Sequence, residues 1–210
     1  MNQKNGKNSI GLDSCFEDLA NPIELFEKWF AEAKKTEIND PNAVALATSD
    51  KNNQPNVRMV LLKGLSEKGF VFYTNFNSKK GLELKNNLKA SMCFHWKSLR
   101  RQVRLLGTVE EVSKKEADDY FNTRPYKNRI GAWASIQSKV LDKRETFLKK
   151  IEEFEKKFTD QNSVPRPPHW SGWRISPSEI EFWLDGEGRI HERLVYLKEK
   201  EKWVKKLLYP

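Results

Sequence analysis

Five strand-like segments between residues 43 and 112 constrain the fold more than any other feature of this sequence. They cover residues 43–48, 58–63, 70–75, 90–96 and 102–112, and most are rich in β-branched, aromatic or small apolar residues. Turns and one short helix join them, and connections this short favour antiparallel neighbours. We therefore expect a mainly β protein with flanking helices (α+β), whose antiparallel sheet forms a barrel or sandwich.

The rest of the chain adds helices and a few strands. A helix is expected from Pro22, with apolar residues at helical spacing, and others from Ser78, at 114–122 and at about 142–158. Strands are expected at 172–176, 179–183 and 193–197, too few to bury a core alone. We therefore expect one domain over residues 21–210, including C-terminal strands at about 170–210, after a mobile N-terminal segment of residues 1–20.

Composition excludes several classes of protein. The chain has 210 residues and seven Trp, which is enough apolar mass for one globular core. It shows no membrane-length apolar run and no signal peptide, so a soluble, cytoplasmic protein is expected. Cys15 and Cys93 lack the spacing of a metal site, and we expect no metal. The net charge of +9 suits nucleic acid or a small phosphorylated ligand, but no nucleic-acid-binding motif is present.

The segment Arg58-Met-Val-Leu-Leu-Lys63 carries a cation at each end of an apolar run. It is expected to form a hairpin with residues 70–75 across the turn at Lys68-Gly69. Side chains five positions apart face opposite ways along a strand, with Cα atoms roughly 16 Å apart. The two cations would then meet two anions, or one anion and solvent. Alternatively, both are strand ends whose side chains reach into water.

Two further groups of cations point to anions. Lys79 and Lys80 follow the capping residue Ser78, where a helix already carries its positive end, so a bound anion would explain them; a solvated lysine pair is the alternative. After a turn at Gly186 and Gly188, residues Arg189, His191 and Arg193 are expected to alternate onto one strand face. An anion or water must separate them, and a solvent-facing strand is the alternative. His95 and His169 are expected to be structural.

Together these motifs resemble the pyridoxamine 5′-phosphate oxidase family. The resemblance covers residue 21 to the C-terminus and rests on several spaced motifs. They are Arg58-Met-Val-Leu-Leu-Lys63, Phe72-Tyr-Thr-Asn75, Ser78-Lys-Lys80, Arg101-Gln-Val103, Tyr120-Phe-x-x-Arg-Pro125, Ile130-Gly-Ala-Trp133, Gln137-Ser138, Glu181-Phe-Trp183 and Arg189-x-His191-x-Arg193.

The resemblance implies an FMN-binding split β-barrel that forms a homodimer, with FMN in clefts at the subunit interface. It implies oxidation of pyridoxamine 5′-phosphate and pyridoxine 5′-phosphate to pyridoxal 5′-phosphate, in vitamin B6 biosynthesis. A hydride would pass from C4′ of the substrate to N5 of the flavin, and O2 would reoxidise the flavin to give H2O2. No nucleic-acid or membrane partner is implied.

The resemblance also implies roles for individual residues. FMN would be contacted by Arg58, Met59, Val60, Leu61, Leu62, Lys63, Tyr73, Thr74, Lys79, Lys80, Gln102, Gln137, Ser138, Trp183 and Arg193, with Arg58, Lys79 and Lys80 on its phosphate. The substrate would be bound by Lys63, Tyr120, Arg124, Asn128, Arg189 and His191, the last two being catalytic. The flavin would carry the redox chemistry, and the protein would position the reactants.

The sequence departs from the family pattern in two places. Asn128 stands where family members commonly carry serine, although an amide can still donate a hydrogen bond to phosphate. The basic, tyrosine-bearing N-terminal segment that often covers the substrate is not recognisable in residues 1–20. Two alternatives therefore remain: a related split-barrel protein that binds flavin or heme without this activity, and a basic nucleic-acid-binding domain, which salt-sensitive binding would favour.

Overall fold

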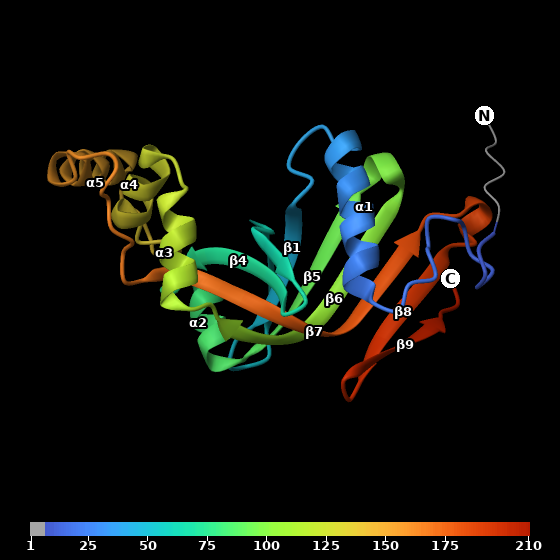
Figure 1. The fold of residues 1–210 in the computed structure, drawn as a ribbon. Coiled ribbons are helices and arrows are strands. Elements are labelled where there is room, and N and C mark those ends of the chain that lie inside the picture. Colours follow the sequence, from blue (N-terminus) through green and yellow to red (C-terminus); the bar gives the residue numbers. More distant parts are fainter. Residues whose placement is uncertain (1–6) are drawn as a thin grey trace.

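A single antiparallel sheet forms the centre of the protein, whose computed structural model describes residues 7–210 (Figure 1). Its strands are β1 Ala43–Ser49, β2 Pro55–Leu61, β3 Gly64–Ser66, β4 Gly69–Asn75, β5 Lys89–Trp96, β6 Arg101–Glu111, β7 Trp170–Leu184, β8 Glu192–Glu199 and β9 Lys202–Leu207. The helices are α1 Pro22–Thr36, α2 Lys79–Asn86, α3 Lys114–Asn122, α4 Tyr126–Ala134 and α5 Arg144–Lys157, with 3₁₀ turns η1 Lys97–Leu99 and η2 Glu187–Arg189. The expected mainly β class is confirmed.

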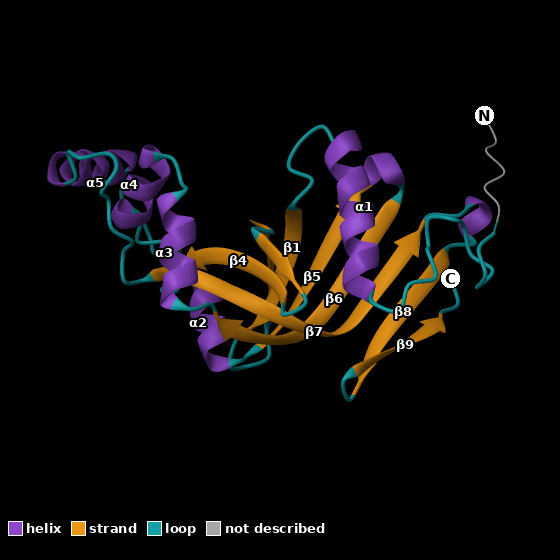
Figure 2. Ribbon diagram, viewed as in Figure 1, coloured by secondary structure: helices purple, strands orange, loops and turns teal. Residues whose placement is uncertain are grey.

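The long strand β7 organises the sheet. Along one edge it pairs with β6, and along the other it pairs first with β4, through residues 170–175, and then with β8, through residues 179–184. The sheet therefore splits into two branches on one side of β7, and it curls into a half-barrel (Figure 2). Two separate strands were expected here. Pro177 does not end the strand, because the register with β6 shifts at Leu106 and Gly107 and accommodates it as a bulge.

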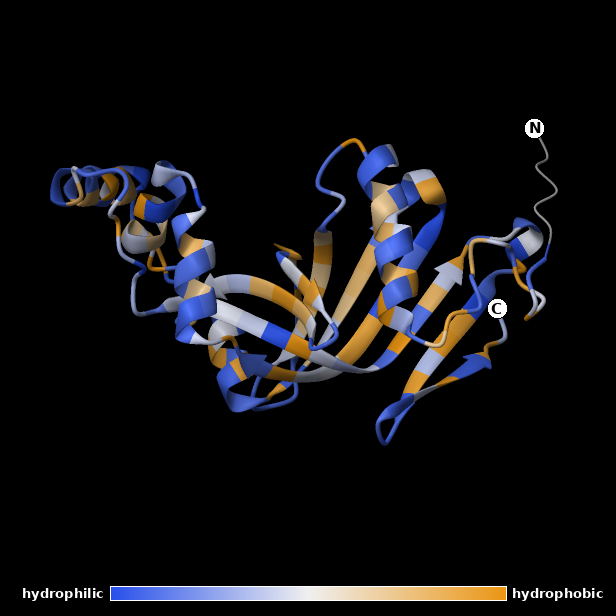
Figure 3. Ribbon diagram, in the orientation of Figure 1, coloured by the Kyte–Doolittle hydropathy of each residue, from blue (hydrophilic) through white to orange (hydrophobic). Residues whose placement is uncertain are grey.

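Helix α1 packs on the sheet and fills the main core. Asn21 caps it, accepting a hydrogen bond from the Ile23 backbone N–H at 3.0 Å, and Pro22 takes the first helical position as expected. The fully buried Phe26 ring lies 4.9 Å from Phe70 and 5.0 Å from Phe94, both edge-on. The apolar stripe of α1 faces the apolar side of the sheet (Figure 3), so core packing accounts for it.

Helices α3, α4 and α5 lie at the other end of the sheet from β8 and β9 (Figure 1) and enclose a second, smaller core. Phe121, Ile130 and Trp170 are buried there, and Trp133 packs on α5. Helix α4 was not expected, because Pro125 directly precedes it and Gly131 lowers its helix propensity. Strand β9 was also not expected. No helix among residues 7–210 is long and apolar enough to cross a membrane.

The expected hairpin between residues 58–63 and 70–75 is wrong. Strand β2 ends at Leu61 and pairs with β1, whereas the short strand β3 forms the hairpin with β4. The chain leaves β2 at Leu62, where the Asn42 side chain donates to the Leu62 carbonyl at 2.9 Å, and the Lys63 N–H donates to Val71 at 2.8 Å. The apolar run at residues 58–63, expected to be one strand, is therefore divided: residues 58–61 pair with β1, and Lys63 bonds to β4.

Much of the N-terminal segment is packed against the domain. Phe16 is fully buried with its ring 5.2 Å from Trp29, whose indole N–H donates to the Cys15 carbonyl at 2.7 Å. The Tyr196 hydroxyl donates to the Leu19 carbonyl at 2.9 Å. Over residues 7–20 the structure thus differs from the expected mobile segment, because scattered apolar residues dock without any periodic pattern. Residues 1–6 lie outside the described residues.

Replacing Phe16 with alanine should lower the free energy of unfolding by about 3–5 kcal/mol, because it removes a buried ring and leaves a cavity. Urea denaturation at a fixed protein concentration measures this. The control is Tyr209→Ala, at a side chain that is 94% exposed, which should change stability little. Equal stability of the two variants would show that the segment does not contribute to the core.

Candidate functional site

One cavity brings together most of the residues that the family pattern assigns to FMN and substrate. It has a volume of about 580 Å³ and opens between β2, β4, α3 and the start of α2. It is lined by Met59, Val60, Leu61, Lys63, Tyr73, Thr74, Lys80, Tyr120, Thr123, Arg124, Pro125, Asn128, Gln137 and Trp170. Eleven of the predicted site residues are therefore neighbours in the structure.

The start of α2 delivers a buried cation to this cavity. Ser78 caps the helix and accepts from the Gly81 N–H at 3.3 Å. A Cβ on Gly81 would lie 2.5 Å from the Phe76 carbonyl oxygen, so only glycine allows this tight turn. The turn places the Lys80 ammonium 3.2 Å from the Thr74 hydroxyl, with 9% of the residue exposed.

Arg58 lies beside Lys80 and is oriented by the protein itself. Its guanidinium donates to the buried carboxylate of Glu83 at 3.2 Å and to the Thr48 hydroxyl. Lys79 donates to the side chain of Asn56 at 3.1 Å. Three cations therefore gather at the entrance to α2 with one buried carboxylate, which contacts Arg58, and the excess positive charge suits a phosphate group.

Aromatic rings form the opposite wall. The ring of Tyr73 stacks on those of Tyr120, at 4.0 Å, and Trp170, at 5.3 Å, and these two rings also stack on each other at 6.2 Å. The guanidinium of Arg124 lies 4.7 Å from the Trp170 ring centre. Its buried Nη1 has no hydrogen-bond partner in the described part of the chain. A buried donor of this kind is available to an acceptor that enters the cavity.

The pKa shifts agree with this interpretation. Burial, with the neighbouring Arg58, lowers the pKa of Lys80, while Glu83 opposes the shift. Burial also lowers the pKa of Arg124. Burial, with the charge of Glu116, raises the pKa of Tyr73 to about 12, so its hydroxyl stays neutral. Both desolvated cations would be stabilised by an anion in the cavity.

The remaining predicted residues lie at the far end of β7. Gln102, Trp183 and Arg193 stand opposite one another on β6, β7 and β8. Arg193 donates to the buried carboxylate of Glu181 at 2.7 Å. Burial opposes the charge of Glu181, but hydrogen bonds from Arg193 and Arg104 hold its pKa below the usual value.

The expected alternation of Arg189, His191 and Arg193 on one strand face is wrong. Strand β8 begins only at Glu192, whereas Arg189 ends the 3₁₀ turn η2 with a positive φ of 64°. His191 lies between that turn and the strand, and its ring centre is 4.7 Å from the Trp183 ring. Two glycines that looked like a hairpin turn instead begin a longer turn that carries both side chains.

The two sets of residues are too far apart to act together within one chain. Thr74 pairs with Ser171 at the start of β7, and Gln102 pairs with Trp183 twelve residues later. Twelve residues of strand span roughly 40 Å. One copy of the chain therefore carries two partial sites at opposite ends of β7.

Some residues differ from expectation. Four residues predicted for this end do not line the cavity, namely Arg58, Leu62, Lys79 and Ser138. Leu62 is buried in the core, and Ser138 adopts a positive φ of 69°. The sequence analysis missed the wall residue Trp170 and the counter-charge Glu83. No local pattern separates Glu83 from other surface glutamates, because only its packing under Arg58 reveals it.

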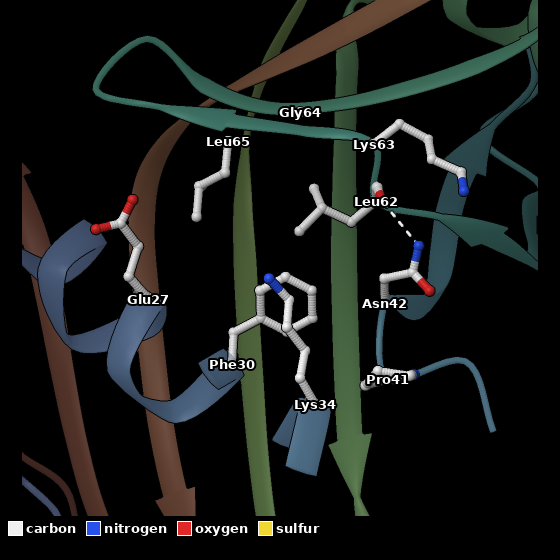
Figure 4. Close-up of a pocket in the computed structure, with 9 residues that line it drawn as sticks. All are labelled: Glu27, Phe30, Lys34, Pro41, Asn42, Leu62, Lys63, Gly64 and Leu65. Atoms are coloured by element: carbon white, nitrogen blue, oxygen red, sulfur yellow. Dashed lines mark hydrogen bonds between the residues drawn. The ribbon is translucent and has the colours of Figure 1, made fainter. Parts of the chain in front are cut away.

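A second cavity of about 640 Å³ lies between α1 and the β2–β3 connection (Figure 4). The side chains of Phe30, Leu62 and Leu65 face this space, and the Lys34 ammonium lies 4.4 Å above the Phe30 ring. The Lys63 ammonium points away from Glu27 and Leu65 (Figure 4). Its lining residues include neither a capped helix start nor a cation with an unpaired buried nitrogen, which are the features of the first cavity that suit an anion.

Comparison with known proteins gives a consistent result. A family model described as pyridoxamine 5′-phosphate oxidase matches residues 30–158, and one described as the pyridoxine 5′-phosphate oxidase C-terminal dimerisation region matches residues 170–210. A pyridoxine/pyridoxamine 5′-phosphate oxidase of Pelagibacter ubique is 64% identical over 207 residues, covering 98% of this chain and all of that protein. One of Allorhizobium ampelinum is 56% identical and covers 93% of this chain and 95% of its own.

Two solved structures are similar in fold. PhzG from Burkholderia lata, in complex with tetrahydrophenazine-1-carboxylic acid, has a TM-score of 0.88 at 28% identity, covering 98% of this chain and 100% of that one. A pyridoxamine 5′-phosphate oxidase-related, FMN-binding protein from Nostoc punctiforme has a TM-score of 0.73 at 17% identity, covering 92% and 99%. The second likeness concerns the fold alone.

Replacing Lys80 with methionine should weaken the binding of a phosphorylated ligand, with FMN as the probe that the resemblance implies, roughly 10- to 100-fold, because one charge-assisted contact contributes about 1.5–3 kcal/mol. Fluorescence titration of the ligand-free protein with FMN measures this. The control is Lys51→Met, in the exposed β1–β2 turn, which should bind FMN as the wild type does.

The same substitution should raise the stability of the ligand-free protein at neutral pH. The buried ammonium of Lys80 has a lowered pKa, so its cost is present below that pKa and disappears as the pH rises toward 10.5. The stability difference between Lys80→Met and wild type should therefore shrink from pH 7 to pH 10 in urea denaturation. A loss of stability at pH 7 would show that Lys80 supports the fold and is not poised for an anion.

Proposed function

The chain belongs to the pyridoxamine 5′-phosphate oxidase family of oxidoreductases, and we propose that it oxidises pyridoxamine 5′-phosphate and pyridoxine 5′-phosphate to pyridoxal 5′-phosphate with FMN. The observation that carries the proposal is the cavity in which a buried lysine and a half-buried arginine, whose buried Nη1 has no partner among the described residues, face a stacked aromatic wall. The relatives at 64% and 56% identity carry the name of this activity.

The residues of the cavity fit FMN. Lys80, Arg58 and Lys79 would hold its phosphate at the start of α2, where backbone N–H groups add favourable dipoles. The backbone of β2 from Met59 to Leu61 would run along the ring system. By family correspondence Leu62, Lys63, Tyr73, Thr74, Gln137 and Ser138 from the same chain, and Gln102, Trp183 and Arg193 from the other end of β7, would complete the FMN site.

The substrate phosphate would bind on the far side of the cavity. Arg124 would supply its unpaired Nη1, and Tyr120, Asn128 and Lys63 line the same space. The stacked ring of Trp170 keeps the Arg124 guanidinium in place. The cations would then serve two separate anions, as the spacing of Arg58 and Lys63 suggested, with Lys63 in the cavity lining and Arg58 beside Lys80.

When bound, FMN would supply the hydride acceptor for oxidation at C4′ of the substrate, with O2 as the final oxidant and H2O2 as its product. The protein's part is positioning and charge. Arg189 would hold the reacting carbon of the substrate against the flavin. His191 would bind the substrate and take part in proton movement. Both side chains belong to the end of β7 that lies far from the cavity of the same chain.

A second copy of the chain would therefore complete each site, and we propose a homodimer with FMN at the interface. Strand β2 is an edge strand of the sheet, and its outward side chains Val57 and Met59 are 71% and 63% exposed. Ile136, Val140 and Leu141 add exposed apolar surface close to Gln137. An uncovered apolar edge of this kind normally marks an interface.

The alternative is a split-barrel flavin or heme protein without this oxidase activity. PhzG, at 28% identity, was solved with tetrahydrophenazine-1-carboxylic acid, so a substrate with a different ring system is part of this alternative. The chain retains both the cationic cavity and the Arg189 and His191 pair, which favours the oxidase.

Anaerobic addition of pyridoxamine 5′-phosphate to the FMN-loaded protein should bleach the flavin absorbance, and air should restore it. Arg189→Gln should slow this bleaching about 100-fold with FMN affinity nearly unchanged, because Arg189 acts on the substrate. Stopped-flow absorbance and FMN titration measure the two effects. The control is Arg144→Gln at the exposed start of α5. A flavin spectrum that ignores the substrate would favour the alternative.

Replacing Val57 with aspartate should weaken the dimer at least 10-fold, since it buries a charge in the proposed interface. Sedimentation velocity over a range of concentrations measures the association, and FMN affinity should fall with it. Ile38→Asp, at a side chain that is 95% exposed in the α1–β1 connection, is the matched control. A Val57→Asp protein as dimeric as wild type would contradict this interface.

A further inference from the structure

The turn that carries Arg189 and His191 closes on itself through Gly186. A Cβ on Gly186 would lie 1.9 Å from the Ile190 carbonyl oxygen, so any side chain would force the turn open. Gly188 and Arg189 both adopt positive φ, at 62° and 64°. The turn is therefore tight and conformationally demanding, and its shape fixes the direction of the His191 side chain.

Two groups of the turn lie within hydrogen-bonding distance of the same ring nitrogen, Nδ1 of His191. The Gly186 backbone N–H donates to Nδ1 at 3.2 Å, so Nδ1 is unprotonated in this arrangement and Nε2 carries the proton. The Asp185 carboxylate oxygen Oδ1 also lies 3.2 Å from Nδ1. It would accept a hydrogen bond from Nδ1 once the ring gains a proton. The imidazole thus has a partner for Nδ1 in either state without moving.

Arg100 holds Asp185 from a different part of the chain. Arg100 lies in the connection between β5 and β6, with a left-handed φ of 57°. It donates from Nε to Asp185 Oδ2 at 3.1 Å and from Nη2 to the Asp185 carbonyl at 3.1 Å, and its own carbonyl accepts from the Asp185 N–H at 3.0 Å. Three hydrogen bonds therefore clamp the residue that directly precedes Gly186.

Several charged groups lie in or beside the turn, but only one of those described contacts a ring nitrogen of His191. Glu187 and Arg189 belong to the same turn, and Glu192 follows it and accepts from the Asp13 N–H at 2.6 Å. Within residues 7–210, only Asp185 and Gly186 meet the His191 ring nitrogens. Asp185 is thus the charged group that contacts the imidazole directly, and Arg100 sets where that charge lies.

We propose that Arg100 and Asp185 are positioning residues that lock the imidazole of His191, through Gly186, so that Nε2 is presented to the substrate. The inference rests on the proposed function, in which His191 binds the substrate. Neither residue belongs to the set that the family pattern assigns. Arg100 holds the turn from outside it. Replacing either Arg100 or Asp185 should therefore allow the His191 ring to reorient.

The first test observes the ring itself and does not depend on activity. The chain has three histidines, so ¹⁵N-histidine labelling of the FMN-loaded protein gives three ring spin systems, and His191→Gln identifies the one of interest. In the wild type with a neutral ring, His191 should be a single Nε2–H tautomer with sharp signals. In Asp185→Ala and in Arg100→Met it should show both tautomers or exchange broadening.

Two further variants separate positioning from a general loss of structure. Asp185→Asn keeps an oxygen that can accept from Arg100, and it should restore the single tautomer that Asp185→Ala loses. Asp160→Ala removes a loop carboxylate that accepts from the Asn162 N–H at 2.9 Å, and it should leave the His191 signals unchanged. Arg100 and Asp185 are partly exposed, so all variants are expected to fold.

The second test is the rate of flavin reduction by pyridoxamine 5′-phosphate. Asp185→Ala and Arg100→Met should each slow it about tenfold with unchanged FMN affinity, and the double variant should be no slower than Asp185→Ala. Wild-type tautomer behaviour and rate in Asp185→Ala, or FMN loss without any change in the ring, would overturn the inference. If wild-type flavin is not reduced, the proposed function fails, and the ring spectra alone decide whether the lock exists.

Discussion

The pairing of strand β7 with two successive partners is the constraint on which the rest of the structure depends. One edge of β7 is occupied by β6, while β4 and then β8 share the other edge. The strand must be long enough for both, and its bulge at Pro177 lets it bend between them. This geometry opens the sheet into a half-barrel. It also fixes one set of functional side chains at each end of the same strand.

Buried carboxylates control the charge at both ends. Glu83 holds Arg58 near the start of α2, and Glu181 holds Arg193 and Arg104 beside the far end of β7. Each carboxylate is almost fully buried, and breaking such a pair leaves an uncompensated charge. The arginines are therefore oriented before any ligand binds. Lys80 and Arg124 lack such a carboxylate contact within residues 7–210, and they are the cations best prepared to receive an anion.

Because the two partial sites lie apart in one chain, the proposed function requires two copies of the chain to pair. The cavity holds the cations Lys63, Lys80 and Arg124, whereas the turn with Arg189 and His191 belongs to the opposite end of the sheet. Pairing two copies would join each cavity to the other copy's turn and would cover the apolar edge of β2. The clamp from Arg100 then matters because the turn must be correctly shaped before the partner meets it. Rigid turns lower the ordering cost of such an encounter.

The sequence by itself determined the fold class, the start of α1 at Pro22, the Ser78-capped helix start that carries Lys79 and Lys80, and the spaced motifs of the family, because these are local patterns of side-chain type. Only the tertiary structure decided that β2 pairs with β1, that Arg189 and His191 lie in a turn before β8, that Phe16 is buried, and that Glu83 and Trp170 complete the cavity. Strand partners, burial and counter-charges depend on contacts between residues distant in the chain, which propensity and periodicity do not encode.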